Sequence, residues 1–294
     1  MAWSYQHDSV ELSPSQFQQW QELLELRTGI DLSQHPSILA AGLKRSMQAS
    51  GADSFDDYFQ HVTEGPAAVA NWARLVDYLS ITETSFFRQN EAMSLARDYL
   101  LERLAAPDWH GSSFDIWSAG CATGEEAYSL AMIANEVIQH LRVKAYLGIV
   151  ASDINAAALT TARRGVYAAR RLERVPKALR HKYFSASDDQ NKAQIVASLK
   201  QQICFVQSNL LALEQAPVMP MDLIYCQNLL VYFRRVRIHQ LLDEMVKRLK
   251  PGGLLIVGPG EAAQWQNPAV VKVERAGVQA FMRRSVNPRL NKSS

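Results

Sequence analysis

The residues best suited to chemistry follow a short apolar segment, Phe114–Ser118, which has the pattern of a buried strand. Residues 119–124 read Ala-Gly-Cys-Ala-Thr-Gly, and Glu125 and Glu126 come directly after them. A glycine-bearing turn between a strand and a helix lets the backbone approach a ligand closely, although the full GxGxxG fingerprint is missing and no lysine follows Gly124. Two carboxylates here would repel a pyrophosphate and favour a cationic ligand. The alternative is that both only compensate the dipole of the following helix.

A second acidic side chain stands at the end of the next apolar segment, Tyr146–Ala151, which is followed by Ser152 and Asp153. An acidic residue at the end of a second strand can hold a ribose diol by two hydrogen bonds. S-adenosylmethionine fits both features, because it has a ribose, a sulfonium and an ammonium group but no phosphate. Asp153 could instead be the N-cap of the helix predicted over Ala156–Arg164. The glycine turn favours the ribose interpretation.

Two further candidates flank the same predicted sheet. Gln227 and Asn228 follow the apolar segment Asp222–Cys226, either as ligand contacts at the strand end or as ordinary turn residues. Arg88 ends a linker in which two phenylalanines precede it. The phenylalanines are typical of a packing wedge, and the Arg88 guanidinium is either a surface charge or a fork that holds a carboxylate.

The elements that would position these residues change character along the chain. After about residue 110, apolar strands alternate with helices, which predicts a parallel sheet with crossover helices. The sheet continues in Leu254–Val257 and ends in a hairpin of Val270–Val273 and Val278–Met282. The polar segment between about 170 and 206 breaks the alternation. We expect an inserted antiparallel subdomain there, with a hairpin of residues 195–199 and 203–207.

The first eighty residues show only helical patterns. Ser13-Pro14-Ser15-Gln16 is a capping-box start, and Gly29 and Gly51 follow the first two helices. The second helix presents Lys44 and Arg45 on its polar face. We therefore expect a helical domain over residues 1–80, a linker and helix over 81–110, and a catalytic sheet domain over 111–294.

Composition narrows the class of protein. The 294 residues are 48% hydrophobic and 20% charged, which is ordinary for a globular chain. A formal net charge of +2 is too balanced for a protein that mainly grips nucleic acid. No signal peptide or membrane span is recognisable, so we expect a cytoplasmic protein without membrane insertion.

The three cysteines do not point to chemistry of their own. Their spacing gives neither a disulfide framework nor a metal site, and we expect no metal. Cys204 and Cys226 are expected to be small buried hydrophobic residues. Cys121 lies in the glycine turn, but no base stands beside it, so we do not expect a nucleophile.

In combination, these segments resemble the CheR-type chemotaxis receptor methyltransferases. The family patterns N-x-T-x-F-F-R, S-x-x-x-x-T-G-E-E-x-Y-S, A-S-D-I, A-R-x-G-x-Y, N-L-L, C-R-N-x-x-x-Y-F and L-K-P-G-G have counterparts here in the family's order. The matching segments are Thr82–Arg88, Ser118–Ser129, Ala151–Ile154, Ala162–Tyr167, Asn209–Leu211, Cys226–Phe233 and Leu249–Gly253.

The resemblance implies a class I S-adenosylmethionine-dependent methyltransferase fold: a Rossmann-like, mostly parallel sheet with an antiparallel C-terminal hairpin. A small all-α N-terminal domain and an inserted antiparallel β subdomain complete it. The implied activity is methyl ester formation on receptor glutamates, with S-adenosylhomocysteine as the product. The implied partner is the cytoplasmic helical domain of a membrane chemoreceptor. The chain is similar to the stand-alone members, including those of type IV pilus chemosensory systems, and we expect a monomer that binds no nucleic acid.

The resemblance also implies roles for individual residues. Arg88 and Tyr232 would be catalytic, and Lys44 and Arg45 would form a receptor-docking patch. Cofactor positions are Thr82, Thr84, Arg88, Gly120, Glu126, Asp153, Asn209, Leu210, Gln227 and Asn228. Three of the family's features are altered: Thr82 replaces an asparagine, Gln227 replaces an arginine, and Gly258–Glu261 replaces a G-x-S-E segment.

Other classes of function stay open at this point. A nicotinamide dehydrogenase is disfavoured by the incomplete glycine fingerprint and the acidic pair. A nucleic-acid methyltransferase is disfavoured by the net charge. A non-catalytic receptor-binding scaffold, or a methyltransferase acting on another substrate, remains an alternative because of the changes at Thr82 and Gln227.

Overall fold

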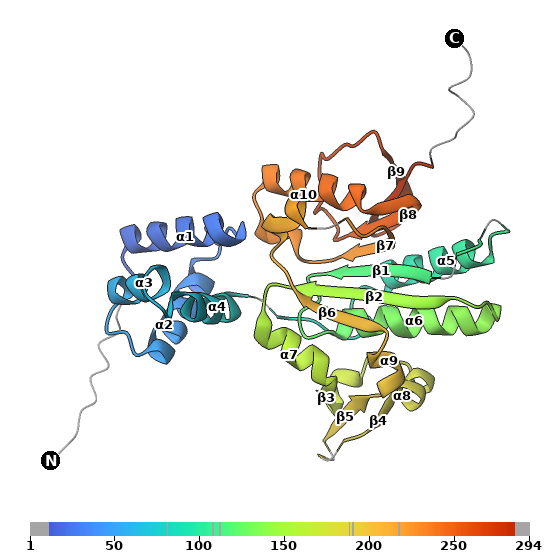
Figure 1. Cartoon of the computed structure of the whole chain (residues 1–294), viewed down its shortest axis with the longest axis horizontal. Helices are drawn as coiled ribbons and strands as arrows, with labels where there is room; N and C mark the ends of the chain where they lie inside the picture. Colours follow the sequence, from blue (N-terminus) through green and yellow to red (C-terminus); the bar gives the residue numbers. More distant parts are fainter. Residues whose placement is uncertain are drawn as a thin grey trace, which may run out of the picture. The chain divides into compact units, whose positions relative to one another are not determined.

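The computed structural model describes residues 12–80, 82–107, 109–111, 113–187, 189, 191–216 and 218–285. The chain divides into two compact units, Met1–Ile81 and Thr82–Ser294 (Figure 1). The first unit contains helices and the second contains the main sheet, so each is described by itself.

Helices α1–α4 make up the described part of the first unit, and their bounds are Pro14–Thr28, Pro36–Ser50, Phe55–Thr63 and Ala68–Leu79. The predicted capping box is confirmed, because the Ser13 hydroxyl accepts from the Gln16 amide at 3.2 Å while the Gln16 side chain accepts from the Ser13 amide at 3.1 Å. Trp20, Leu39 and Tyr58 lie in a shared apolar core. The exposed sides of the helices are left to polar residues such as Lys44 and Arg45 of α2.

The second unit contains a seven-stranded sheet with the order β6-β2-β1-β7-β8-β10-β9. The first five strands in that order are parallel, and β10 and β9 are antiparallel to their neighbours. The bounds are β1 Ser113–Ala119, β2 Tyr146–Asp153, β6 Ile203–Gln207, β7 Met221–Cys226, β8 Leu249–Val257, β9 Val270–Arg275 and β10 Val278–Arg283. The expected parallel sheet and C-terminal hairpin are therefore confirmed.

Helices cover both faces of this sheet (Figure 1). Helices α5 (Asn90–Ala105) and α6 (Glu125–Leu141) pack on one face, and α10 (Arg235–Lys247) packs on the other. Strand β7 shows the division, since Tyr225 belongs to the core under α5 and α6, whereas Cys226 belongs to the core under α10. Because a buried parallel sheet needs apolar side chains on both faces, every residue of β7 is buried.

A smaller antiparallel sheet has the order β3-β5-β4, with β3 at Val166–Ala168, β4 at Phe184–Ala186 and β5 at Lys192–Ile195. The short elements around it are α7 Ala156–Arg164, η1 Ala169–Leu172, α8 Lys177–Tyr183 and α9 Ala197–Lys200. An inserted antiparallel sheet was expected, and one is present.

The strands expected at the end of that insertion are wrong. Residues 195–199 do not form a hairpin with 203–207, because Ala197–Lys200 is a helical turn that buries Leu199. Ile203–Gln207 is β6, which pairs in parallel with β2 at the edge of the main sheet. Two short apolar segments close in sequence look like a hairpin, but the turn α9 leads the chain to a different sheet.

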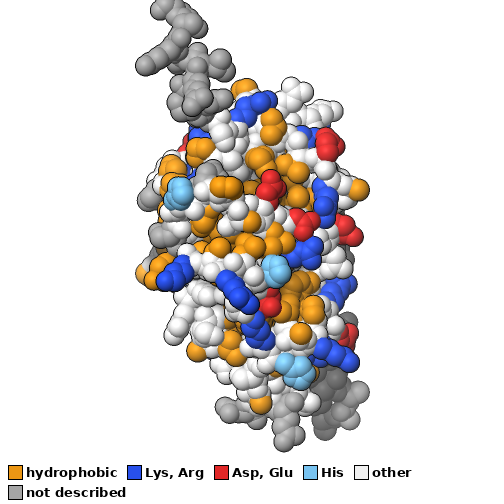
Figure 2. All heavy atoms as spheres, turned by 90° about the vertical axis from the view of Figure 1, so that its right-hand side faces the viewer, with side chains coloured by type: hydrophobic (Ala, Val, Ile, Leu, Met, Phe, Trp, Pro, Cys, Tyr) orange, Lys and Arg blue, Asp and Glu red, His pale blue; other side chains and the backbone are white. Residues whose placement is uncertain are grey.

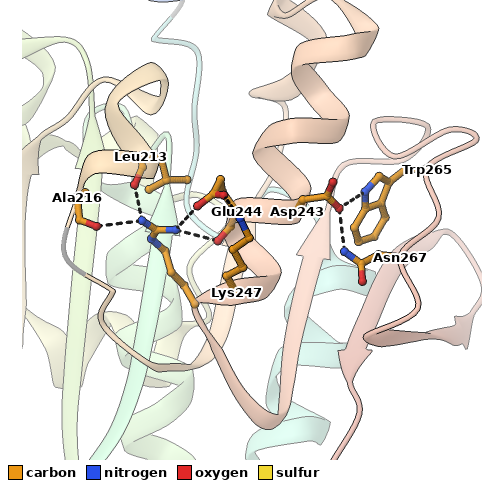
Figure 3. A network of polar contacts seen from close by, with 8 residues as sticks. Leu213, Ala216, Asp243, Glu244, Lys247, Trp265 and Asn267 are labelled. Carbon is orange, nitrogen blue, oxygen red and sulfur yellow. Dashed lines mark hydrogen bonds and ion pairs between the residues drawn. The ribbon is translucent and has the colours of Figure 1, made fainter.

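A buried arginine connects the end of α10 to the segment that precedes β7 (Figure 3). Arg248, at the end of α10, pairs with Glu244 at 2.9 Å and donates to the carbonyls of Leu213 and Ala216. Those carbonyls belong to or follow the helical turn η2 (Leu210–Gln215). A guanidinium with several fixed acceptors holds η2 in one position against α10.

The same helix also holds the loop after β8. Asp243 accepts from the Trp265 indole at 3.0 Å and from the Asn267 amide at 2.8 Å, as Figure 3 shows. Figure 2 views the molecule from the right-hand side of Figure 1, and on that face Lys, Arg, Asp, Glu and hydrophobic side chains are intermixed. In the part of the chain that the structure describes, no helix is long and apolar enough to cross a membrane.

Candidate active site

The turn after β1 depends on its two glycines. Gly120 has φ 78° and Gly124 has φ 94°, a region that favours glycine. A Cβ at Gly124 would lie 2.8 Å from the Cβ of Ala162, and one at Gly120 would lie 2.8 Å from the Leu229 side chain. The Gly120 amide donates to the Ser152 carbonyl at 2.8 Å, which ties this turn to the end of β2.

The two carboxylates at the start of α6 have different surroundings. Glu125 is fully buried, accepts from the Thr123 hydroxyl at 2.6 Å and pairs with Arg171 at 2.9 Å. Glu126 accepts from the Ser118 hydroxyl at 2.6 Å. The protein itself therefore supplies the partners of Glu125, so this carboxylate has a structural role and is not needed for a ligand. Of the acidic pair, Glu126 is the better candidate to meet a cationic ligand.

Electrostatics support that distinction. Burial, together with the nearby negative charge of Glu261, raises the pKa of Glu126 to about 8, although the Ser118 hydrogen bond and the Arg88 charge oppose the shift. A raised carboxyl pKa means that the ionised form is poorly stabilised by the protein. A cation beside Glu126 would supply the missing stabilisation.

Asp153, the last residue of β2, is held by the backbone around it. One carboxylate oxygen accepts from the Ala122 amide at 2.8 Å and the other from the Asn155 amide at 2.9 Å. The N-cap of α7 is Asn155, whose side chain accepts from the Ala158 amide at 2.7 Å. The N-cap explanation for Asp153 is therefore wrong, and Asp153 instead joins the glycine turn to the end of β2.

Asn209 and Leu210 lie beside the end of β2 because β6 is the neighbouring strand. The Ser208 amide donates to the Asp153 carbonyl at 2.9 Å, which fixes the start of this loop. Asn209 caps η2 by accepting from the Leu211 amide at 3.0 Å, and Leu210 is buried. The structure thus brings these two predicted residues to the same sheet edge as Asp153.

Polar side chains without partners follow β7. Gln227 is 7% exposed, yet neither its amide nitrogen nor its amide oxygen has a hydrogen-bond partner among the described residues. The hydroxyl of Tyr225, two residues earlier on the same face, is also buried without one. Such groups are rare in native proteins because leaving them unpaired costs free energy. Their presence at the carboxyl end of a parallel strand fits a polar ligand such as the cofactor.

Asn228, next to Gln227, has φ 56° and accepts from the Gln89 side chain at 3.5 Å. The left-handed region is tolerated by asparagine more readily than by most residues. This contact joins the end of β7 to the segment that leads into α5. The strand end and the linker segment therefore meet at the site.

That linker segment is fastened to the sheet unit at several points. Phe86 is fully buried and packs edge-to-face on Tyr167 and Phe184, which belong to the same unit of the chain. The Phe87 amide donates to the Ser129 hydroxyl of α6 at 3.0 Å. Arg171 reaches back to donate to the Thr84 carbonyl at 3.0 Å.

Arg88 is partly buried and donates to the Glu83 carbonyl at 2.6 Å. Its charge acts on two other candidates, because it lowers the pKa of Tyr232 and of Glu126 against the raising effect of burial. The charge of Arg88 thus links it electrostatically to Tyr232 and to Glu126. Thr82, at the start of this segment, is also partly buried.

Glu261 is a residue whose role in this site the sequence did not reveal. It is 5% exposed and accepts from the amides of Gly258 at 2.7 Å and Leu230 at 3.0 Å. Leu230 begins the turn η3 (Leu230–Tyr232), so Glu261 holds the backbone that carries Tyr232. The acidic residue after the glycines of 258–260 was the available signal. Ser118, which is eight residues from Glu126, was also missed. Ser129 and Arg171 were missed because their partners Phe87, Glu125 and Thr84 include residues that are distant in sequence.

The cysteines show one further correction. Cys121 and Cys226 are buried, and burial raises the pKa of both thiols, which agrees with the absence of a nucleophile. Cys204 was expected to be buried but is exposed. It lies on β6, whose outer edge carries no further strand of the main sheet within the described residues.

The glycine turn after β1, the acidic residue at the end of β2 and the unpartnered polar groups after β7 share one edge of a largely parallel sheet. That arrangement defines a class I S-adenosylmethionine-dependent methyltransferase.

Comparison with known proteins gives the family. Residues 82–279 match "CheR methyltransferase, SAM binding domain", and residues 15–80 match "CheR methyltransferase, all-alpha domain". The chain belongs to the CheR family of chemotaxis protein methyltransferases.

Several relatives have similar length and domain coverage. The chain is 34% identical over 248 residues to "Chemotaxis protein methyltransferase 2" of Pseudomonas aeruginosa, covering 83% of this chain and 85% of that protein. It is 30% identical over 236 residues to a chemotaxis protein methyltransferase of Borreliella burgdorferi, with coverage of 79% and 83%. It is 27% identical over 257 residues to a chemotaxis protein methyltransferase of Escherichia coli, and the matched region covers 86% of each of the two chains.

Proposed function

We propose that this enzyme forms glutamate methyl esters on a chemoreceptor with Arg88 and Tyr232 at the reacting centre. The observation that supports this is the shared edge at which β1, β2, β6 and β7 end. Glu126, Asp153 and Gln227 come from three of those strand ends or the helix that follows them. Carboxyl ends of parallel strands are where ligands bind in sheets of this type.

Each cofactor contact follows from the charge or hydrogen-bonding capacity of the side chain. S-adenosylmethionine supplies an electrophilic methyl group on its sulfonium. Glu126 meets the ammonium group of the cofactor, and Asp153 accepts from the two ribose hydroxyls. Gln227 offers one donor group and one acceptor to the polar end of the cofactor. The remaining proposed contacts are Thr82, Thr84, Arg88, Gly120, Asn209, Leu210 and Asn228.

No general base is needed for this reaction. A glutamate side chain has a reference pKa of about 4.3, so it is already ionised and nucleophilic near neutral pH. The protein must place the carboxylate in line with the methyl group, which is a proximity effect. It must also exclude water from both charged reactants.

Arg88 and Tyr232 are the residues that we assign to that placement. The Arg88 guanidinium offers a planar set of donors to the incoming carboxylate. The Tyr232 hydroxyl stays protonated, since burial raises its pKa, and it donates a hydrogen bond near the reacting methyl group. Glu261 accepts a hydrogen bond from the Leu230 amide of η3, and this contact keeps the Tyr232 hydroxyl in place.

Receptor docking belongs to the same proposal. The exposed Lys44 and Arg45 of α2 suit an acidic helical receptor, and they meet it on the cytoplasmic side of the membrane. A K44E/R45E variant with an unchanged receptor KM would remove this docking patch from the account. A type IV pilus pathway is the sensory context that we propose, and we propose that the enzyme acts there as a monomer.

The test of the function uses the purified enzyme, labelled S-adenosylmethionine and receptor-containing membranes. We expect label in the receptor that base treatment releases as methanol, because a methyl ester is hydrolysed and an N-methyl group is not. Membranes that carry the receptor with its methylated glutamates replaced by alanine are the matched control. Label that survives base, or label that is equal in the control, would contradict the proposal.

A further inference from the structure

An exposed basic and apolar surface begins directly after Tyr232. We define the arginine patch as Val231, Arg234, Arg235, Val236 and Arg237. Val231 is 59% exposed and Val236 is 73% exposed, although both are large hydrophobic residues. The three arginines are also exposed.

Two arginines of the patch, Arg235 and Arg237, carry positive charge that the protein does not use internally. Arg235 and Arg237 form no ion pair or side-chain hydrogen bond with the rest of the chain that the structure describes. From position 227 to position 242 the sequence contains no aspartate or glutamate. The positive charges therefore point to a partner outside the chain.

Stability does not explain these arginines. They occupy the N-cap and first turn of α10, which has no acidic residue there and no side-chain cap. Positive charge at this end of a helix opposes the helix dipole and lowers the stability of the helix. A sequence selected for folding alone would place serine, aspartate or glutamate at these positions.

The position of the patch is fixed next to the reacting centre. Val231 is in η3 beside Tyr232, and Glu261 accepts from the Val231 amide at 3.4 Å. The other end of α10 is anchored by Arg248 and by Asp243 (Figure 3). Arg235 follows Tyr232 by three residues, which span about 10 Å at most, so a helix bound to the patch lies close to the proposed site of methyl transfer.

We propose that the arginine patch docks the acidic helical segment of the chemoreceptor that carries the glutamate to be methylated. This inference rests on the proposed function. Charge complementarity carries it: guanidinium groups bind neighbouring receptor carboxylates, and the two valines pack on the apolar side of the same receptor helix. The patch acts on the substrate alone and contributes nothing to cofactor binding. It also steers the encounter over a distance set by the ionic strength.

The experiment compares two double charge reversals in the full-length enzyme. R235E/R237E removes the patch, whereas R142E/K144E reverses two exposed basic residues that precede β2 at the opposite edge of the sheet. Glutamate in the first turn of α10 suits the helix dipole, so R235E/R237E is expected to fold. R235Q/R237Q is a second variant that removes charge without reversing it. Each is assayed for receptor KM, kcat and affinity for S-adenosylhomocysteine.

We expect R235E/R237E to raise the receptor KM about tenfold or more, because juxtaposed like charges disfavour docking. R235Q/R237Q raises it by a smaller factor, and R142E/K144E leaves it unchanged. The affinity for S-adenosylhomocysteine stays at the wild-type value in all three. Added salt lowers kcat/KM of the wild-type enzyme, and it lowers kcat/KM of R235E/R237E by a smaller factor.

Two results overturn different parts of the account. An R235E/R237E enzyme with the wild-type receptor KM and the wild-type salt dependence overturns the docking role while leaving the methyltransferase intact. A wild-type enzyme that binds S-adenosylhomocysteine but methylates no receptor glutamate overturns the proposed function, and the docking role with it.

Discussion

The two sides of the site differ in how their polar groups are satisfied. Around β1 and β2, Ser118 bonds Glu126, Arg171 pairs with Glu125, and Asp153 accepts from two backbone amides. Around β7, the Tyr225 hydroxyl and both polar atoms of Gln227 are buried without a partner among the described residues. The side chains of the first side are held by contacts within the protein, whereas the second side has hydrogen-bonding capacity that no described residue uses.

This difference predicts which substitutions affect stability and which affect ligand binding. On the satisfied side, a side chain holds both the protein and the cofactor, so a substitution affects folding and binding together. On the unsatisfied side, removal of a polar group relieves an internal cost but loses a ligand contact. The predictions below use that contrast, beginning with the residue that we place between the two sides.

The largest effect is expected at Arg88. Arg88→Ala removes the donor that orients the receptor carboxylate, and the loss of one well-placed donor in a reacting centre lowers kcat about 10²–10³-fold. Labelled methyl transfer under saturating receptor measures this loss. Arg88→Lys should recover only a small part of it, because an ammonium lacks the planar fork. Near-normal turnover in Arg88→Ala would remove Arg88 from the reacting centre.

Asp153 should give the next largest effect. Asp153→Asn keeps the side-chain shape but weakens charge-assisted hydrogen bonds to the ribose, so the affinity for S-adenosylhomocysteine falls about 10–100-fold. Calorimetric titration measures the dissociation constant. Asp98→Asn, on the exposed surface of α5, is the matched control and should bind normally. Equal affinities in the two variants would argue against a ribose contact.

Glu126 should make cofactor binding depend on pH. Its pKa of about 8 means that the carboxyl is mostly protonated near neutral pH, so ammonium binding improves as pH rises. Its contribution to S-adenosylhomocysteine affinity should increase about tenfold between about pH 7 and pH 9. Comparison of wild type with Glu126→Gln isolates this dependence from titration of the ligand itself. Parallel pH profiles for the two proteins would contradict the assignment.

The same residue gives the opposite trend for folding of the ligand-free enzyme. A carboxyl with a raised pKa binds more protons in the folded than in the unfolded state between its two pKa values. The free energy of unfolding therefore falls as pH rises from the unfolded-state pKa, near that of a free glutamate, to about 8. Thermal melts of wild type and Glu126→Gln across this range measure the difference.

Gln227 should give the smallest effect and the sharpest test of the contrast. Gln227→Leu removes two unpartnered polar atoms, so the free energy of unfolding stays equal or rises by about 1–3 kcal/mol. The same change should weaken S-adenosylhomocysteine binding severalfold, because a ligand contact is lost. Chemical denaturation and calorimetry measure the two quantities. Loss of stability without any loss of affinity would show that the amide is structural.

Much of the fold was predictable because the relevant signals are local. The capping box at Ser13 involves residues three apart, and the alternation of strands and helices from β1 onward appears directly in the apolar pattern. The failures involve neighbours that sequence order does not reveal. Residues 203–207 were paired with the nearest apolar segment, whereas they pair with β2. Cys204 was expected to be buried because its position at a sheet edge was not visible.

The residue types of the site were predictable from the sequence, but the role of each individual residue was not. Glu125 and Glu126 are adjacent and alike in sequence, and only the approach of Arg171 from η1 separates them. Asp153 and Asn155 could each cap α7, and the structure assigns the cap to Asn155. The burial of Gln227 depends on tertiary packing around the end of β7, which no local pattern contains.

The most direct test of the central claim is to identify the residue that carries the methyl group. The receptor is incubated with the wild-type enzyme and S-adenosylmethionine, digested, and analysed by mass spectrometry before and after base treatment. We expect base-labile methylation on glutamates of the receptor's cytoplasmic helices, and its loss with Arg88→Ala. Methylation of another residue type, or none with an enzyme that binds S-adenosylhomocysteine, would contradict the account.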